Sequence, residues 1–525
     1  YCGHNEFLER RTYSRLMATP SAVRETAAIL ARSRVYTSAR TLLRAFGSGR
    51  SQDSSEAFEL PEEVDAILDH AVIGPDDYQR DDEQRNQVID HYRFNLGRII
   101  EIARSVGAGV LLINPAANER NMSPFNSQHS DDVKPVDVTR WEELATQAAT
   151  HQESGELEEA LNALDQAVDI DPLYALAHFK RGEILFALRR YQEAKQSFQR
   201  AIDEDVCPLR ILSEMKPVIT EVASLYDVKV VDFQELLEKK TESGVTGEEW
   251  FLDHVHPTIQ GHRELALSLL GELQSQGIVD PESQWTEEAR QQVDAKVMGS
   301  IDERAHGVAL RNLAKVLSWA RKYDEAGRLA QLAMTKLSDD ADAHFLAGFE
   351  FERKGQLDLA KESYQKAIQL RPHYRRAHFN LGQVHRRLEE WDLAAGAFQR
   401  TIEIEPDFFL AHFHLGLLHQ RANRLDRAAE CFETSTTINA KHPGSWEELG
   451  KVRLNQGRID DAVHHLELAI QLEPKLASAH NSLGVAFAKS GQFQKAVAAF
   501  ERALTISPQY DSAMQNLERA RKLVK

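Results

Sequence analysis

The chain has 525 residues, which excludes a single small module because domains average about 100 to 200 residues. Its 81 acidic residues exceed its 63 basic residues, and the net charge of −18 disfavours a protein that binds nucleic-acid phosphates along its length. No apolar run approaches the ~18 residues of a membrane-crossing helix, and three widely spaced cysteines give no support for a disulfide framework or a zinc-binding spacing.

The first half of the chain predicts helices that alternate with buried strands. Apolar residues recur at helical spacing in three stretches, 84–106, 209–226 and 259–274. Short apolar runs bounded by turn residues are typical of buried parallel strands, and they lie at 109–114 and 228–232. We therefore predict an α/β domain that comprises 1–140 and 209–275.

An inserted segment, 141–208, separates the two predicted strands. It shows a repeated helical pattern in which Ala160 and Phe198 belong to successive units. The insertion leaves the domain after Asn114, at the carboxyl end of a strand, where α/β sheets carry their chemistry. We therefore expect the inserted pair to overhang a cleft.

A helical linker at 276–306 leads into a strictly periodic second half. Alanine recurs every 34 residues, at Ala326, Ala360, Ala394, Ala428, Ala462 and Ala496. Glycine recurs in the same phase, at Gly348, Gly382, Gly416, Gly450 and Gly484. Small residues at these places let two antiparallel helices approach closely. The spacing predicts six helical hairpins over 307–510 and a capping helix at 511–525.

This pattern resembles the tetratricopeptide repeat, whose units have 34 residues, small residues at the helix contact and proline at the exit. The resemblance implies an all-α solenoid over 307–510, and it extends to the inserted pair at 141–208. Solenoids of this kind present extended surfaces to partners, so the resemblance implies a protein or peptide ligand.

Two sets of side chains are candidates for a peptide groove. The fifth place of three repeats carries Phe345, Phe379 and Phe413, which we expect on an apolar floor. The thirteenth place carries Arg353, Arg387 and Arg421, which we expect along a basic edge. The alternative is that the rings pack between helices and that the arginines are a solvated face.

Histidine recurs at the fourth place of five repeats, at His178, His344, His378, His412 and His480. One ring per repeat falls short of the three or four converging ligands that a metal needs. The fourth place also lies close to the small residue that packs on the second helix. We therefore expect histidines of the repeat interior and neither a metal nor a cofactor.

Two motifs mark the ends of the predicted α/β domain. Gly3-His4-Asn5-Glu6 opens the chain, and Asp253-His254-Val255-His256-Pro257 precedes the last helix. Together they resemble the SGNH (GDSL-like) hydrolase family. The resemblance implies that Asn5 is an oxyanion donor, that His256 is the general base and that Asp253 orients it. The structural alternatives are an Asx turn at Asn5 and a helix-entry turn at Asp253 and His256.

The nucleophile of that family is a serine in a Gly-Asp-Ser segment, and this sequence contains none. The chain starts at Tyr1, so we expect an enzyme domain that lacks its N-terminal part and is inactive as given. A signal or anchor upstream would not be visible, and the compartment stays open.

The expected function combines two parts. The α/β domain would be an esterase, with a small acyl ester on a carbohydrate or lipid-like substrate, and the repeats would recruit a protein partner. The alternative is a non-enzymatic scaffold with a structural hydrolase-like remnant. A Gly-Asp-Ser segment upstream of Tyr1 would favour the enzyme over the scaffold.

Overall fold

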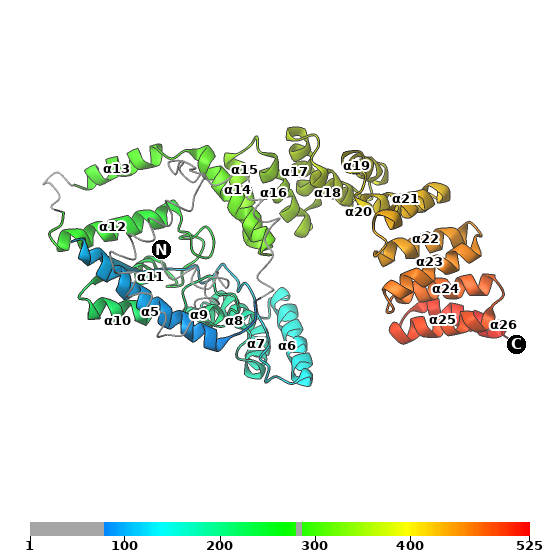
Figure 1. Cartoon of the computed structure of the whole chain (residues 1–525), viewed down its shortest axis with the longest axis horizontal. Coiled ribbons are helices and arrows are strands. Elements are labelled where there is room, and N and C mark those ends of the chain that lie inside the picture. Colours follow the sequence, from blue (N-terminus) through cyan, green and yellow to red (C-terminus); the bar gives the residue numbers. More distant parts are fainter. Residues whose placement is uncertain (1–77, 280–285, 525) are drawn as a thin grey trace, which may run out of the picture. The chain divides into compact units, whose positions relative to one another are not determined.

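The computed structural model of the protein describes residues 78–279 and 286–524, which include neither Asn5 nor its motif. The described chain forms two compact units (Figure 1). Unit 1 holds the described residues up to Asp302 together with Asn312–Leu329, and unit 2 holds Glu303–Arg311 with the chain from Ala330 onward. The boundary therefore passes through the first of the six predicted hairpins.

The non-repetitive part of unit 1 follows the predicted order of helices and strands. Its elements are α5 (Asp82–Ser105), β1 (Leu111–Asn114), α10 (Met215–Leu225), β2 (Lys229–Asp232), α11 (Phe233–Lys240) and α12 (Ile259–Ser275). Strands β1 and β2 pair in parallel, which confirms the predicted strand direction. Among the described residues the sheet has only these two strands, so the fold does not establish an α/β domain of the SGNH type.

The core beside this sheet comes from two helices. Helix α5 buries Tyr92, Leu96 and Ile100 at intervals of four, and these side chains pack with Val218 and Val222 of α10. A helix whose apolar residues recur at this spacing has one buried face. The Asp81 carboxylate caps α5 by accepting a hydrogen bond from the backbone N–H of Gln84 at 2.8 Å.

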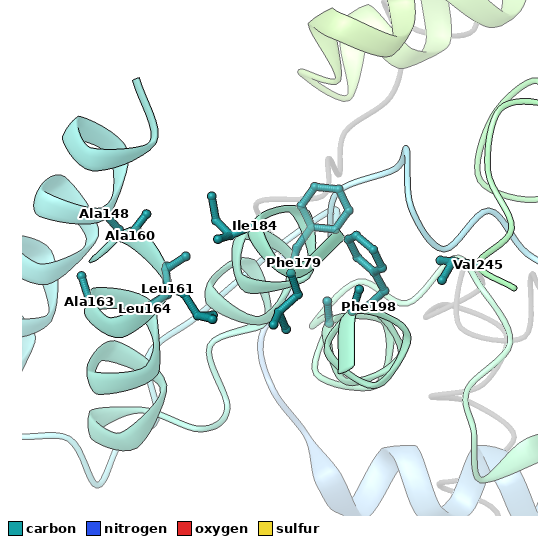
Figure 2. Close-up of a cluster of buried hydrophobic side chains, with 12 residues drawn as sticks. Ala148, Ala160, Leu161, Ala163, Leu164, Phe179, Ile184, Phe198 and Val245 are labelled. Atoms are coloured by element: carbon teal, nitrogen blue, oxygen red, sulfur yellow. The ribbon is translucent and has the colours of Figure 1, made fainter. Parts of the chain in front are cut away.

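The inserted segment consists of two helical hairpins, as predicted. They are α6 (Pro135–Glu153) with α7 (Leu157–Ile170), and α8 (Ala175–Ala187) with α9 (Tyr191–Asp203). Phe198 of α9 is fully buried and lies against Gly182 of α8, where an added Cβ would come within 2.7 Å of the ring. The same core includes Val245, from the loop that leads toward the Asp253 motif (Figure 2).

Regular hairpins continue through the second half of the chain. The first is α14 (Glu303–Trp319) with α15 (Tyr323–Lys336), and the single helix α13 (Glu287–Gly299) precedes it. Five hairpins follow it, α16 (Ala341–Arg353) with α17 (Leu357–Leu370), α18 (Arg375–Arg387) with α19 (Trp391–Ile404), α20 (Phe409–Arg421) with α21 (Leu425–Ile438), α22 (Pro443–Asn455) with α23 (Ile459–Leu472), and α24 (Ala477–Lys489) with α25 (Phe493–Ile506). Helix α26 (Asp511–Leu523) ends the series. We call α16 to α26 the repeat array.

Each hairpin of the array is closed by the predicted contact between a small residue and a large one. An added Cβ at Gly382 would lie 2.7 Å from the ring of Phe398, and one at Gly416 would lie 2.7 Å from Phe432. Both rings are fully buried. The glycines are therefore required by close helix packing, since interiors of this density leave no room for a side chain there.

Candidate functional site

Asp253 and His256 lie in one tight turn and form a hydrogen-bonded pair. Oδ2 of Asp253 is 2.7 Å from Nδ1 of His256, and Oδ1 accepts hydrogen bonds from the backbone N–H groups of Val255 and His256. The Asp253 side chain is fully buried, whereas 62% of the His256 side chain is exposed. The structure thus brings together two of the three predicted catalytic residues; we call this pair the dyad.

The charges of the dyad follow from these contacts. Burial alone would raise the pKa of Asp253, but the hydrogen bond from His256 and the nearby imidazoles outweigh it and lower the pKa to about 2. The hydrogen bond to Asp253 raises the pKa of His256 against the opposing effect of burial. An anionic carboxylate that fixes the imidazole on Nδ1 leaves Nε2 as the basic nitrogen.

The turn is closed by the chain on both of its sides. Phe251 and Pro257 form an antiparallel bridge, and the Leu252 N–H donates to the His256 carbonyl at 2.8 Å. Helix α12 then begins at once, with its N-terminus capped by the Thr258 hydroxyl. Gly261 is needed in the first turn of α12, because an added Cβ would approach the Trp250 carbonyl to 2.8 Å.

His254, the other histidine of the motif, differs from His256 in its surroundings. Its ring is edge-on to Phe125, with centroids 5.0 Å apart. Burial lowers the pKa of His254 to about 4, although the Asp253 charge opposes the shift. His254 is therefore neutral at physiological pH, and His256 is the histidine of the motif that can exchange protons with a ligand.

Two residues that the sequence analysis did not identify support the dyad. Asn118 is buried, and its backbone N–H and side-chain Nδ2 donate to the His254 and Asp253 carbonyls at 3.0 and 3.1 Å. The buried Arg210 guanidinium donates to the carbonyls of Asn118 and Met122 at 3.0 and 2.8 Å. The sequence offered one signal for Asn118, its position four residues after the end of β1, where polar residues often contribute to a site.

The described residues supply no nucleophile for the dyad. Within them, Nε2 of His256 forms no hydrogen bond with a serine or cysteine, and Cys207 is a buried thiol whose pKa is raised to about 12, mainly by burial. Asn5 lies outside the described residues, so its oxyanion role stays a prediction.

The predicted groove floor is corrected at Phe345. Only 9% of this residue is exposed, and its ring packs beside Tyr364 and Tyr374 in the core of the array. Phe379 and Phe413 are half-buried and contact the aromatic rings of their own and the following repeat. The fifth place faces the neighbouring hairpin, so large apolar side chains there fill the interface between repeats.

The predicted basic edge stays at the surface, and its arginines are held by neighbours. Arg353 bonds to the Glu350 carboxylate at 3.1 Å, and Arg387 donates to the Glu352 carbonyl at 3.1 Å. The Arg421 guanidinium stacks 3.9 Å from the centroid of the Trp391 ring. All three arginines are exposed.

The recurring histidines have a structural role. Each ring Nε2 lies 2.8 to 3.1 Å from the carbonyl oxygen six residues earlier, in the contacts His178–Pro172, His344–Ser338, His378–Pro372, His412–Pro406 and His480–Pro474. In the one array hairpin without this histidine, α22 with α23, Trp446 donates from Nε1 to the Ala440 carbonyl, also six residues back. In these six hairpins, a ring N–H at the fourth place therefore satisfies a carbonyl of the preceding turn.

The part of the chain that the structure describes contains no cluster of three or more side chains suited to a metal ion. No helix in the same part is long and apolar enough to cross a membrane.

Comparisons with known proteins concern the repeats. The tetratricopeptide repeat profile matches residues 146–205, 345–407, 385–443 and 447–511, a set that leaves out the dyad. A search of curated proteins gives no match.

Similar solved structures include YrrB, described as a TPR protein with an unusual peptide-binding site. It is 19% identical with a TM-score of 0.33 and covers 35% of this chain and 96% of its own. PilF of Pseudomonas aeruginosa is 18% identical with a TM-score of 0.37 and covers 40% and 97%. MamA is 21% identical with a TM-score of 0.31 and covers 32% and 92%. The profile match and the 34-residue hairpins together show that this chain contains tetratricopeptide repeats.

Proposed function

We propose that the repeat array is a scaffold that binds a protein partner through an acidic segment. The observation that carries this proposal is the row of Arg353, Arg387 and Arg421, one per hairpin, exposed and fixed by neighbouring groups. A guanidinium that is already held in place loses little conformational entropy when it binds a carboxylate.

The aromatic rings contribute to this function indirectly. Phe379 and Phe413 pack against neighbouring rings, so they fix the spacing of the hairpins and with it the spacing of the arginines. The partner contact is then mainly electrostatic, and its affinity should fall as salt is added. This differs from an apolar groove, whose affinity depends little on salt.

Peptide selection from a random library displayed on phage tests this proposal on the full chain. We expect the selected peptides to be acidic, and a variant with Arg353, Arg387 and Arg421 changed to glutamine should lose most of their binding. A matched variant changes three other arginines of the array to glutamine, Arg400, Arg427 and Arg458, and should bind like the wild type. Peptides without acidic residues, or equal losses in both variants, would contradict the proposal.

We also propose a second function, in which the dyad is the general base of an ester hydrolase of SGNH type. The 2.7 Å contact between Asp253 and His256, the burial of the carboxylate and the exposure of the imidazole support it. This is the arrangement in which a histidine takes a proton from a nucleophilic hydroxyl. The substrate class would be an acyl ester on a carbohydrate or lipid-like molecule, with Asn5 as oxyanion donor.

The hydrolase proposal requires a nucleophilic serine, and no serine of residues 78–279 and 286–524 forms a hydrogen bond with the His256 ring. The test therefore measures hydrolysis of a chromogenic acetyl ester by this chain and by a version extended before Tyr1 with its natural coding sequence. We expect turnover only in the extended protein, and we expect His256→Gln to abolish it. Loss of one oxyanion donor in Asn5→Ala should cost about 10²- to 10³-fold. Undiminished turnover by His256→Gln would rule out the dyad as the base.

A further inference from the structure

The backbone of the dyad turn is held at three consecutive carbonyl groups. The Asp253 and His254 carbonyls accept hydrogen bonds from Asn118, at 3.1 and 3.0 Å. The third, the carbonyl of Leu252, accepts a hydrogen bond from Nη2 of Arg328 at 2.7 Å. Arg328 belongs to α15, so a tetratricopeptide-like hairpin supplies one of the three contacts.

The same hairpin makes a second set of contacts close to the dyad turn. Nε of Arg328 lies 3.4 Å from the Glu248 carboxylate, on the segment that leads into the turn. At the junction of α14 and α15, Nζ of Lys322 donates to the Ser123 hydroxyl at 2.9 Å and lies 5.3 Å from the centre of the Phe125 ring. Phe125 is in turn edge-on to His254. All of these residues belong to unit 1.

We propose that Arg328 is a positioning residue for the dyad, so that the α14–α15 hairpin forms part of the hydrolase site as well as the start of the repeats. This inference rests on the second proposed function. The Leu252 carbonyl and the Asp253 N–H share one peptide plane, so the bond from Arg328 fixes the orientation in which the chain enters Asp253. A charged donor to a carbonyl makes a stronger hydrogen bond than a neutral one.

Removal of the Arg328 side chain is expected to change only the geometry of the dyad. Without Arg328, the peptide before Asp253 can rotate, and the contact between Oδ2 and Nδ1 of His256 is held less often. Because that contact raises the pKa of His256, its partial loss lowers the pKa. Among the described residues, the charged group that acts on the imidazole is the Asp253 carboxylate, and the adjacent His254 is neutral near physiological pH.

The experiment measures the pKa of His256 in the full chain without any substrate. Diethyl pyrocarbonate acylates neutral imidazoles, and peptide mass spectrometry gives its rate at His256 across the pH range in which histidine titrates. The midpoint of the rate profile reports the pKa, and its plateau at high pH reports exposure. Arg328→Met keeps the aliphatic stem of the side chain and removes the donor, and circular dichroism verifies that each variant is folded.

Three further variants make the result specific. Arg328→Lys keeps a charged donor, Glu248→Gln breaks the ion pair but keeps the bond from Arg328 to Leu252, and Asp253→Asn removes the carboxylate charge. We expect the midpoint to fall most in Asp253→Asn, to fall less in Arg328→Met, to recover partly in Arg328→Lys and to match the wild type in Glu248→Gln. If Arg328→Met does not fold, Arg328→Gln, which is too short to reach the carbonyl, takes its place.

The outcomes distinguish a failure of the positioning role of Arg328 from a failure of the hydrolase proposal. A wild-type midpoint in Arg328→Met, together with a lowered one in Asp253→Asn, overturns the positioning role and leaves the dyad intact. A wild-type midpoint in Asp253→Asn overturns the dyad and with it the hydrolase proposal. A fall in Glu248→Gln as large as that in Arg328→Met shows that the ion pair is responsible and also overturns the proposal.

Discussion

The repeat array and the dyad region are stabilised by contacts of very different sequence separation. In the array, the defining contact joins Gly382 to Phe398 within one hairpin, and its equivalents recur every 34 residues. In the dyad region, the Asp253 carbonyl is held by Asn118, 135 residues away, and Arg210 reaches Asn118 over 92 residues. A repeated spacing makes the first kind of contact visible in a sequence, whereas single contacts between distant segments leave no such pattern.

Histidine shows the same difference at the level of one side chain. His256 is exposed beside a carboxylate, which raises its pKa. His414 lies in the array among the rings of Phe379, Phe398 and Phe413, and burial lowers its pKa to about 4. One imidazole is therefore available for proton transfer, and the other is a neutral part of a core.

The largest effect is expected from Arg210→Ala, because the dyad region depends on single long-range contacts. Arg210 is fully buried, with its guanidinium 3.9 Å from the Asp205 carboxylate, and its removal leaves that carboxylate without its counter-charge and two backbone carbonyls without their donor. Breaking a buried charge pair costs about 3 to 5 kcal/mol of unfolding free energy. Hydrogen exchange of peptides around Asn118 and Asp253 measures this loss of stability.

Arg140→Ala is the matched control for Arg210→Ala, since Arg140 pairs with Glu143 at the surface, where both side chains are exposed, and such pairs contribute about 0 to 1 kcal/mol. Equal effects of the two changes would mean that burial of Arg210 does not stabilise the region.

Acid should weaken the array through His414. The ordinary pKa of 6.5 applies to the unfolded chain, and the folded value is about 4, so the unfolded state binds more protons between these values. Stability is therefore complete above pH 6.5 and falls as the pH drops toward 4, by about 3 kcal/mol. Hydrogen exchange of array peptides against pH should show this slope, and His414→Leu should reduce it. An unchanged slope in His414→Leu would refute the assignment.

Two glycines of one array hairpin should respond in opposite directions. Gly382→Ala places a methyl group 2.7 Å from the Phe398 ring and should destabilise the hairpin by about 1 to 3 kcal/mol. Gly396 in α19 has open space around its Cβ position, so Gly396→Ala should stabilise the helix by about 0.5 to 1 kcal/mol. Hydrogen-exchange rates of peptides from α18 and α19 measure the stability changes caused by both substitutions. Destabilisation by Gly396→Ala would show that packing in the array extends beyond the predicted contact.

The sequence was sufficient to predict the hairpins of the array, because the same 34-residue spacing of small and large residues recurs in all of them. It was also sufficient for the pairing of Asp253 with His256, since a turn of four residues brings both side chains together without help from the rest of the fold. It was insufficient for Asn118, Arg210 and Arg328, whose importance arises only when distant segments meet.

Phe345 was misplaced for a related reason. Helical geometry gives the direction of a side chain relative to its own helix only, and the Phe345 ring also contacts Tyr364 in the second helix of its own hairpin. Whether that direction leads to solvent depends on the neighbouring hairpin, which contributes Tyr374 against the ring. Large apolar side chains at such places are more often buried between repeats than exposed in a groove.

The smallest effect concerns two helix caps with the same chemistry in different settings. The Thr258 hydroxyl caps α12 directly after the dyad turn, and the Thr286 hydroxyl caps α13, a helix without buried residues. Thr258→Ala should cost about 1 kcal/mol of unfolding free energy, because α12 packs through Gly261 against the chain at Trp250. Thr286→Ala should leave global stability unchanged, since α13 has no buried residues and the ion pair of its Asp294 with Arg263 of α12 is partly exposed. Denaturant unfolding of the full chain compares them, and equal losses would mean that α13 is as strongly coupled to the fold as α12.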